Sequence, residues 1–261
     1  MDKNTYFTDH WQDIEPARIA RYEQMFQWRD EHAAMLQPLQ PEAGCRILDY
    51  GCGPGFVSMG LAEVVGETGH VYGVDLNAQF VADSARRAEG KPNVTFHQTN
   101  GYEVPLDDGA VHRVFCKNVL EYVADPAQTL DEFKRVLAKD GRMLLIDSDW
   151  RFVLVEPWGQ ARTERFFEAA AIAFKTPTIG RALRALVQMA GFEQVEVSIR
   201  AGVDTTGGSL AVIRNMASYI AEFERLPHEE VDEMLAELEA AIESGKYMFS
   251  LPQFFITASR P

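Results

Sequence analysis

The sequence predicts an α/β protein with a doubly wound, mostly parallel sheet of seven strands and helices on both faces. After Pro41, short apolar runs alternate with amphipathic stretches, which is typical of strand–helix–strand units. The first run leads into a glycine-rich turn that opens a helix. Of the 261 residues, 46% are hydrophobic and 25% are charged, enough apolar material for a sheet buried on both faces. We therefore expect one core with added helices.

The segment before this core has a helical pattern. Between residues 15 and 39, Ile19, Tyr22, Met25 and Met35 recur at roughly helical intervals among charged residues. This spacing predicts an N-terminal helical extension. We expect residues 1–40 to form a helical lid over the core.

The core pattern predicts five strands in succession, at residues 45–50, 70–74, 94–97, 111–116 and 142–147. Helices are expected between them at residues 56–65, 77–88 and 126–138, and Asn77 caps the second of these. Asp140 and Gly141 form the turn before the fifth strand.

Beyond Trp150 the pattern becomes less regular. Helices are expected at residues 159–174 and 179–189, followed by a strand at 194–200. A further helical pair at 210–224 and 228–243 precedes a closing strand at 247–259. We therefore expect residues 41–261 to form one domain with a helical insertion at about 204–245, which is a candidate cover for a substrate.

Composition excludes several classes of partner. The formal net charge of −14 would repel a nucleic-acid backbone or an anionic membrane. Three irregularly spaced cysteines provide neither a disulfide framework nor a zinc site, so no metal is expected. The polar, acidic N-terminus does not resemble a signal peptide. We expect a cytoplasmic protein with a small-molecule substrate, and its oligomeric state stays open.

The strongest chemical signal is the turn after the first strand, which contains Gly51, Gly53 and Gly55. Glycines let the backbone approach a ligand closely, and the helix that follows presents free N–H groups. Asp75 closes the second strand 20 residues after Gly55. A carboxylate in that place can accept both hydroxyl protons of a ribose. These features indicate a cofactor that contains a nucleoside.

The residues around the turn favour S-adenosylmethionine over other nucleosides. A dinucleotide fingerprint needs a glycine where Phe56 stands, and the Gly-Lys-Ser/Thr of a phosphate-binding loop is absent. Asp49, next to the turn, would repel phosphate but suits a cationic amino-acid tail. S-adenosylmethionine has such a tail and no phosphate, and its product would be S-adenosylhomocysteine.

Three segments within residues 45–150 resemble the class I methyltransferases, especially the ubiquinone/menaquinone-biosynthesis type. The segments are ILDYGCGPG, VYGVDLNAQFVADSARR and NVLEYVADPAQTLDEFKRVLAKDGRMLLID. The resemblance implies that the last strand of the sheet is antiparallel. It also implies a set of cofactor-binding residues along the chain: Asp49, Gly51, Gly53, Gly55, Asp75, Leu76, Asn100, Gly101, Tyr102, Lys117, Asn118 and Val119.

The methyl acceptor is expected beyond the carboxyl ends of the fourth and fifth strands, because ligands of open α/β sheets bind there. Glu121 and Tyr122 follow the fourth strand, and the polar loop from Asp147 to Arg151 follows the fifth. We expect Glu121, Asp147 or Asp149 to orient an amine or imidazole nitrogen and to remove its proton. Further contact with the substrate is expected from Tyr122, Trp150, Arg151, Tyr6 and Trp11.

Other functions stay open at this point. The acceptor could instead be an oxygen or carbon of a quinone or phenol. A nucleotide-cofactor oxidoreductase conflicts with the glycine spacing, and a cofactor-binding protein without catalysis conflicts with the intact glycines and Asp75.

Overall fold

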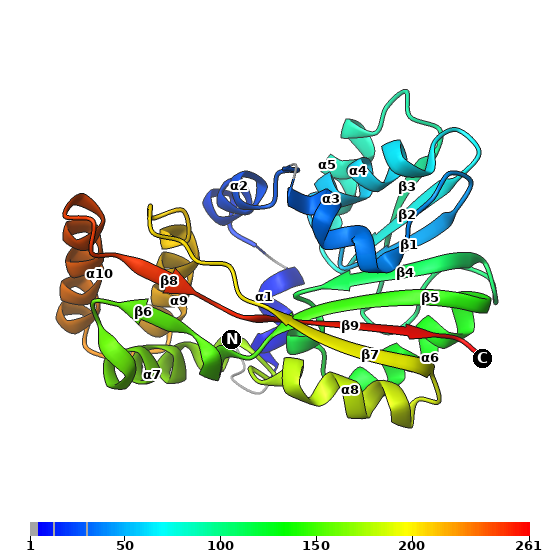
Figure 1. Cartoon of the computed structure of the whole chain (residues 1–261). Helices are drawn as coiled ribbons and strands as arrows, with labels where there is room; N and C mark the ends of the chain where they lie inside the picture. Colours follow the sequence, from blue (N-terminus) through cyan, green and yellow to red (C-terminus); the bar gives the residue numbers. More distant parts are fainter. Residues whose placement is uncertain (1–4, 13, 30) are drawn as a thin grey trace.

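A seven-stranded sheet forms the centre of the protein in the computed structural model (Figure 1), which describes residues 5–12, 14–29 and 31–261. Its strand order is β3-β2-β1-β4-β5-β9-β7. Strands β1 to β5 are parallel, and β9 runs antiparallel between β5 and β7. The strands are β1 (Arg46–Tyr50), β2 (His70–Asp75), β3 (Val94–Gln98), β4 (Val111–Lys117), β5 (Leu137–Ser148), β7 (Glu193–Arg200) and β9 (Gln253–Ser259). The expected fold class is confirmed.

Helices cover both faces of this sheet. On one face, α4 (Phe56–Val65) and α3 (Glu31–Leu36) pack on apolar side chains of β1, β2 and β5, and α5 (Ala78–Arg87) lies along β2 and β3. On the other face, α6 (Pro126–Val136) and α8 (Ile179–Met189) bury their apolar sides against β4, β5 and β9. Parallel strands buried on both faces explain the nearly continuous apolar runs in the sequence.

A second hydrophobic core lies outside the sheet. It is built by α7 (Gly159–Ala170), α9 (Leu210–Glu222), α10 (His228–Glu243) and a two-stranded sheet of β6 (Leu154–Glu156) and β8 (Met248–Ser250). We call these five elements the cap. Figure 1 shows the cap at one end of the molecule and the large sheet at the other. The insertion expected at about 204–245 therefore packs with α7 and β6, which come from an earlier part of the chain.

The N-terminal segment joins the cap to the core. Helix α1 (Tyr6–Gln12) contributes Tyr6 to the cap core, where its hydroxyl donates to Glu222 Oε2 at 2.6 Å. The amide of Asn77 in the core donates to the carbonyl of Trp11 at 2.9 Å. Helix α2 (Pro16–Met25) packs over Phe80 of α5. Figure 1 shows α1 and α2 between the cap and the core helices.

The single helix predicted over residues 15–39 is wrong. The chain forms α2, leaves helical conformation after Phe26, and resumes with α3 and a short 3₁₀ turn at Gln37–Leu39. The break brings the Trp28 ring onto α4, into the space that a Cβ at Gly60 would fill. Packing of one aromatic ring thus overrides the helical periodicity of the sequence.

The closing strand predicted over residues 247–259 is in fact two strands. Strand β8 pairs with β6 in the cap, and β9 pairs with β5 and β7 in the large sheet. Pro252 lies between them, and a proline has no N–H to donate to a strand partner. Within the part of the chain described above, no helix is both long and apolar enough to cross a membrane.

Candidate active site

A cavity of about 370 Å³ lies at the carboxyl ends of β1, β2 and β4. Its walls include the turn after β1, Leu76 after β2 and Asn118 after β4. The carboxyl ends of parallel strands share one edge of the sheet, and ligands of α/β folds bind there. The volume is within the range of about 300 to 1,000 Å³ that is usual for small-molecule sites.

The glycine turn after β1 supports this cavity in two ways. Gly51 lies at φ +72°, and a Cβ there would overlap the side chain of Val119, which also lines the cavity. Gly55 lies at φ +78° and begins α4, but a Cβ there would meet Ser84 and Phe96. Gly51 therefore allows Val119 to pack directly on the turn, whereas Gly55 allows α4 to pack closely on its neighbours.

Asp75 lies at the end of β2 and lines the cavity. Its carboxylate accepts the backbone N–H groups of Gly53 and Asn77, both at 2.8 Å. Burial raises the pKa of Asp75, and these two N–H groups act in the opposite direction. The side chain is thus fixed between the glycine turn and the start of α5.

Asp49 is the second carboxyl group in the cavity wall. It belongs to β1, is 2% exposed, and accepts the hydroxyl of Ser58 at 2.5 Å. Burial raises the pKa of Asp49 to about 7, even though the Ser58 hydroxyl lowers it. A positively charged ligand group beside Asp49 would favour the ionised form.

The loop after β3 closes one side of the cavity with Asn100, Gly101 and Tyr102. Asn100 holds the loop in shape, because its Oδ1 accepts the backbone N–H groups of Tyr102 at 3.0 Å and Glu103 at 2.9 Å. The Tyr50 hydroxyl donates to the carbonyl of Gly101 at 2.9 Å. The loop is therefore anchored to β1 as well as to itself.

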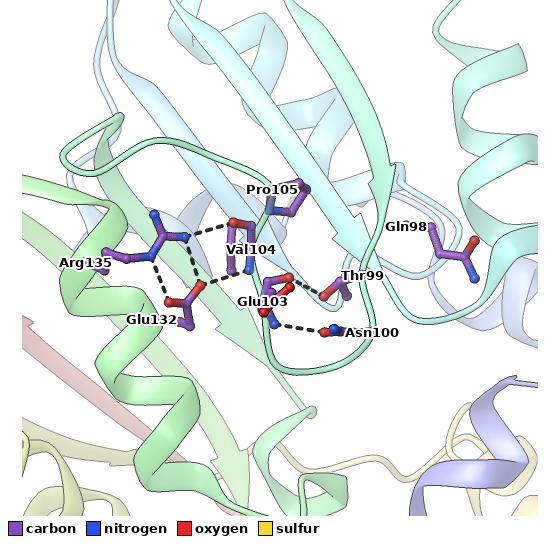
Figure 2. Close-up of a pocket in the computed structure, with 8 residues that line it drawn as sticks. All are labelled: Gln98, Thr99, Asn100, Glu103, Val104, Pro105, Glu132 and Arg135. Atoms are coloured by element: carbon purple, nitrogen blue, oxygen red, sulfur yellow. Dashed lines mark hydrogen bonds and ion pairs between the residues drawn. The ribbon is translucent and has the colours of Figure 1, made fainter.

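The outer side of the same loop is held by α6, as Figure 2 shows. Glu132 accepts the N–H of Val104 at 3.0 Å, and Arg135 donates to the carbonyl of Val104 at 2.9 Å. Arg135 also forms an ion pair with Glu132 at 2.8 Å. These groups satisfy one another's hydrogen bonds and charges. The residues around the hollow of about 510 Å³ between the loop and α6 therefore hold the cavity loop in place.

Another end of the cavity is formed by the last residue of β4 and the residues that follow it. Lys117, Asn118, Val119 and Tyr122 line it, and Trp11 from α1 meets the Tyr122 ring edge-to-face at 5.0 Å. Asn118 lies at φ +53° and accepts the side-chain amide of Gln253 at 3.0 Å. Helix α1, the loop after β4 and the strand β9 therefore meet at this end.

Comparison with known proteins agrees with this geometry. A family model described as a methyltransferase domain matches residues 41–200, which is more than half of the chain. The chain belongs to the methyltransferase domain family. This result confirms the expected class I S-adenosylmethionine-dependent methyltransferase of the ubiquinone/menaquinone-biosynthesis type.

Relatives of this methyltransferase include quinone-modifying enzymes. The ubiquinone/menaquinone biosynthesis C-methyltransferase UbiE of Rhizobium johnstonii is 26% identical over 204 residues, which is 71% of this chain and 76% of that one. An uncharacterized 37.1 kDa protein in transposon TN4556 of Streptomyces fradiae is 33% identical over 166 residues. That match covers 63% of this chain and 48% of the Streptomyces protein, so it spans about half the length of that relative.

Solved structures share the fold of this methyltransferase. A SAM-dependent methyltransferase from Aquifex aeolicus has a TM-score of 0.56 at 18% identity, covering 95% of this chain and all of that one. A phosphoethanolamine N-methyltransferase 2 from Haemonchus contortus has a TM-score of 0.66 at 16% identity, covering 98% of this chain and 60% of that chain. At these identities the likeness concerns the fold alone.

Most of the cofactor residues expected from the sequence line the cavity of the methyltransferase. They are Asp49, Gly51, Gly53, Asp75, Leu76, Asn100, Gly101, Tyr102, Lys117, Asn118 and Val119, whereas Gly55 is not among them. Tyr122 and Trp11, expected at the substrate, also line it. The residues present fit S-adenosylmethionine, since the lining contains two carboxylates, Asp49 and Asp75, beside a glycine turn whose backbone a ligand can approach closely.

Six of the expected catalytic and substrate residues lie outside this lining: Tyr6, Glu121, Asp147, Asp149, Trp150 and Arg151. Glu121 is buried behind the cavity and accepts the indole N–H of Trp150 at 2.7 Å. Asp149 forms an ion pair with Arg181 and accepts the N–H of Arg151 at 3.0 Å. Arg151 itself is exposed. Glu121, Asp147 and Asp149 follow or end the expected strands, but their side chains are buried in the protein.

Several residues that line the cavity were not expected there from the sequence. Some follow directly from the motifs, being neighbours of the glycine turn or of a strand end, and the rest come from the lid and the cap, where no motif marked them. They are Thr8, Met25, Phe26, His32, Tyr50, Cys52, Pro54, Phe56, Val57, Phe80, Thr99, Phe115, Val123 and Val212.

Proposed function

We propose that this protein transfers a methyl group from S-adenosylmethionine to an oxygen or carbon atom of an apolar, aromatic small molecule. The observation that carries the proposal is the lining of the cavity beside the end of β4. Trp11, Tyr122, Val123 and Val212 form apolar and aromatic walls there. A flat ring can stack between such side chains, and the walls exclude water from the reaction.

At the other end, the residues described above would hold the cofactor. Asp75 would accept the ribose hydroxyls, Asp49 would pair with the cationic amino-acid tail, and the loop that contains Asn100 would flank the adenine. When bound, S-adenosylmethionine supplies a methyl group activated by a sulfonium. The chain then has to align the acceptor with that methyl group and exclude water.

The alternative acceptors, an amine or an imidazole nitrogen, have less support. Among the described residues that line the cavity, Asp49 and Asp75 are the only carboxylates, and both belong to the proposed cofactor end. Glu121, Asp147 and Asp149 would have to leave buried positions to reach an amine. The names of relatives such as 2-phytyl-1,4-naphtoquinone methyltransferase of Trichormus variabilis, 26% identical over 171 residues, also favour a quinone-like ring.

Calorimetry and an acceptor screen test this function. We expect S-adenosylmethionine and S-adenosylhomocysteine to bind and NAD(H) not to bind. With isotope-labelled methyl donor, phenols and reduced quinones should accept label, whereas amines and imidazoles should not. Selective binding of NAD(H) would contradict the cofactor, and labelling of amines alone would contradict the acceptor class.

The proposal also covers the partners and the cellular location of the protein. A net charge of −14 makes nucleic acid an unfavourable partner and suits a small-molecule enzyme. We propose a cytoplasmic location on the basis of the same acidic composition and the absence of a disulfide framework in the sequence.

We expect the affinity for S-adenosylhomocysteine to increase as the pH rises through about 7, the pKa of Asp49. Below that pH the carboxyl is protonated and cannot pair with the ligand ammonium, so each unit of pH costs up to about tenfold in affinity. Asp75 lines the same cavity, has a pKa that burial raises as well, and acts in the same direction. Calorimetry between about pH 5.5 and 8 measures the effect.

The Asp49→Asn variant is the control for this pH dependence. It should bind more weakly and with little change over the same pH range, because the residue no longer ionises. A wild-type affinity that is constant, or that falls as the pH rises, would contradict the role given to Asp49.

A further inference from the structure

The cavity wall contains one charged group that the proposed function has not used. Lys117, the last residue of β4, lies beside Asn118 and Tyr122 at the acceptor end. It is the only lysine or arginine in the lining formed by the described residues. Its ammonium forms no hydrogen bond or ion pair with any residue in the described ranges 5–12, 14–29 and 31–261.

Two buried carboxyl groups stand behind Lys117 and act on it electrostatically. Glu121 is 2% exposed and Asp147 is 1% exposed. Burial lowers the pKa of Lys117, and the charges of Asp147 and Glu121 oppose that change. Burial raises the pKa of both carboxyls, and the charge of Lys117 opposes that change in turn. Lys117 and each carboxyl group therefore favour one another's charged forms, whereas the charge of Asp147 adds to the raised pKa of Glu121.

The two carboxyl groups are held in place from outside the cavity. The indole N–H of Trp150 donates to Glu121 Oε2 at 2.7 Å. The backbone carbonyl of Glu121 accepts the N–H groups of Lys175 at 2.9 Å and Thr176 at 3.0 Å. Asp147 accepts the N–H of Ser148 at 3.0 Å. Both carboxyl groups are thus held in buried positions outside the cavity lining. Lys117 has a long, flexible side chain and is the charged group that can reach a ligand.

An ammonium at an apolar wall is costly unless a partner of opposite charge or a hydrogen-bond acceptor reaches it. The methyl donor would bring a second positive charge, the sulfonium, into the same cavity. Two cations in a medium of low dielectric repel each other, and an anionic atom placed between them is attracted by both. A protonated amine in that place would meet the repulsion of both cations instead.

We propose that Lys117 binds the ionised hydroxyl oxygen of the methyl acceptor. The acceptor class is therefore a phenol or an enol on a flat ring, bound as its anion, and Lys117 is the residue that selects it. This inference rests on the proposed aromatic acceptor. It adds that one oxygen of the ring carries the charge and lies at the end of β4.

The test uses 2-naphthol as the probe and the full protein saturated with S-adenosylhomocysteine. The naphthol and its anion differ in ultraviolet absorption, so a pH titration followed by absorbance reports the apparent pKa of the bound probe. We expect wild-type protein to lower that pKa by at least about one unit, which is a tenfold preference for the anion. Lys117→Met should abolish the shift, and Lys117→Arg should retain most of it.

Two controls separate this inference from the proposed function. The resemblance groups Lys117 with the cofactor residues, but this inference assigns it to the acceptor. The affinity of Lys117→Met for S-adenosylhomocysteine should therefore stay within about twofold of the wild type, which also shows that the variant is folded. The neutral ether 2-methoxynaphthalene should bind both proteins equally well. Its affinity therefore reports contact with the aromatic walls alone, without a contribution from an anionic oxygen.

Three outcomes would overturn the inference. If the ether binds but naphthol shows no pKa shift in the wild type, Lys117 does not select an anion, and the aromatic acceptor still stands. If neither probe binds to the complex, the proposed acceptor class fails as well. If Lys117→Met loses affinity for S-adenosylhomocysteine as strongly as for naphthol, the lysine belongs to the cofactor.

Discussion

Replacing Asp75 with alanine is expected to weaken the binding of S-adenosylhomocysteine at least about a hundredfold, or roughly 2.8 kcal/mol. The ribose would lose a carboxylate that can accept two hydrogen bonds, and bonds to charged groups contribute about 1.5 to 3 kcal/mol each. The N–H groups of Gly53 and Asn77 would also lose their shared acceptor, which lies 2.8 Å from each. Calorimetry on purified protein measures the loss.

Two further variants make the Asp75 result interpretable. Asp131→Ala removes an exposed carboxyl on α6 and should leave the affinity unchanged. Asp75→Asn keeps the size of the side chain but turns a donor toward one N–H or one ribose hydroxyl, so its affinity should fall between wild type and alanine. Unaltered binding by Asp75→Ala would remove the basis of the cofactor assignment.

Gly51→Ala is expected to reduce both cofactor binding and stability. The added Cβ would overlap the side chain of Val119, and a residue with a Cβ is strained at φ +72°. Overpacking costs about 1 to 3 kcal/mol and the left-handed backbone about 1 to 2 kcal/mol. We expect the free energy of unfolding to fall by about 2 to 5 kcal/mol and the affinity for S-adenosylhomocysteine to fall at least tenfold.

Gly245→Ala is the matched control for this substitution. Gly245 lies at φ +68° in the turn after α10, and no atom lies within 4 Å of the position of an added Cβ. This variant should therefore show the backbone strain alone, about 1 to 2 kcal/mol, with normal affinity. Equal losses of stability in the two variants would show that the contact between Gly51 and Val119 is unimportant.

The sequence predicted the cofactor half of the site well because its signals are local. A strand, a glycine turn and a helix N-terminus follow one another within a dozen residues, and Asp75 ends the very next strand. In parallel sheets, the order of the strands along the chain and their common direction bring such ends to one edge. The positions of Gly51, Asp75 and Asn118 at a single cavity follow from this rule.

No such rule predicts which side chains line the acceptor half of the site. Asp147 and Glu121 end or follow the expected strands, but the direction of their side chains depends on what packs against them. The indole N–H of Trp150 holds the carboxyl group of Glu121, which is not part of the cavity lining. From the sequence, the same carboxylates looked available to a substrate. Packing, which no local pattern records, makes Lys117 the charged group at that wall.

The sequence by itself determined the sheet, the glycine turn, the carboxylates at the cofactor end and the family. Only the tertiary structure decided that the lid is broken at Trp28, that the last strand divides at Pro252, and that Val212 of the cap reaches the cavity. The physical reason is the range of the interactions. Hydrophobic periodicity and turn geometry act over neighbouring residues, whereas the cap and the lid are placed by contacts between segments far apart in the chain.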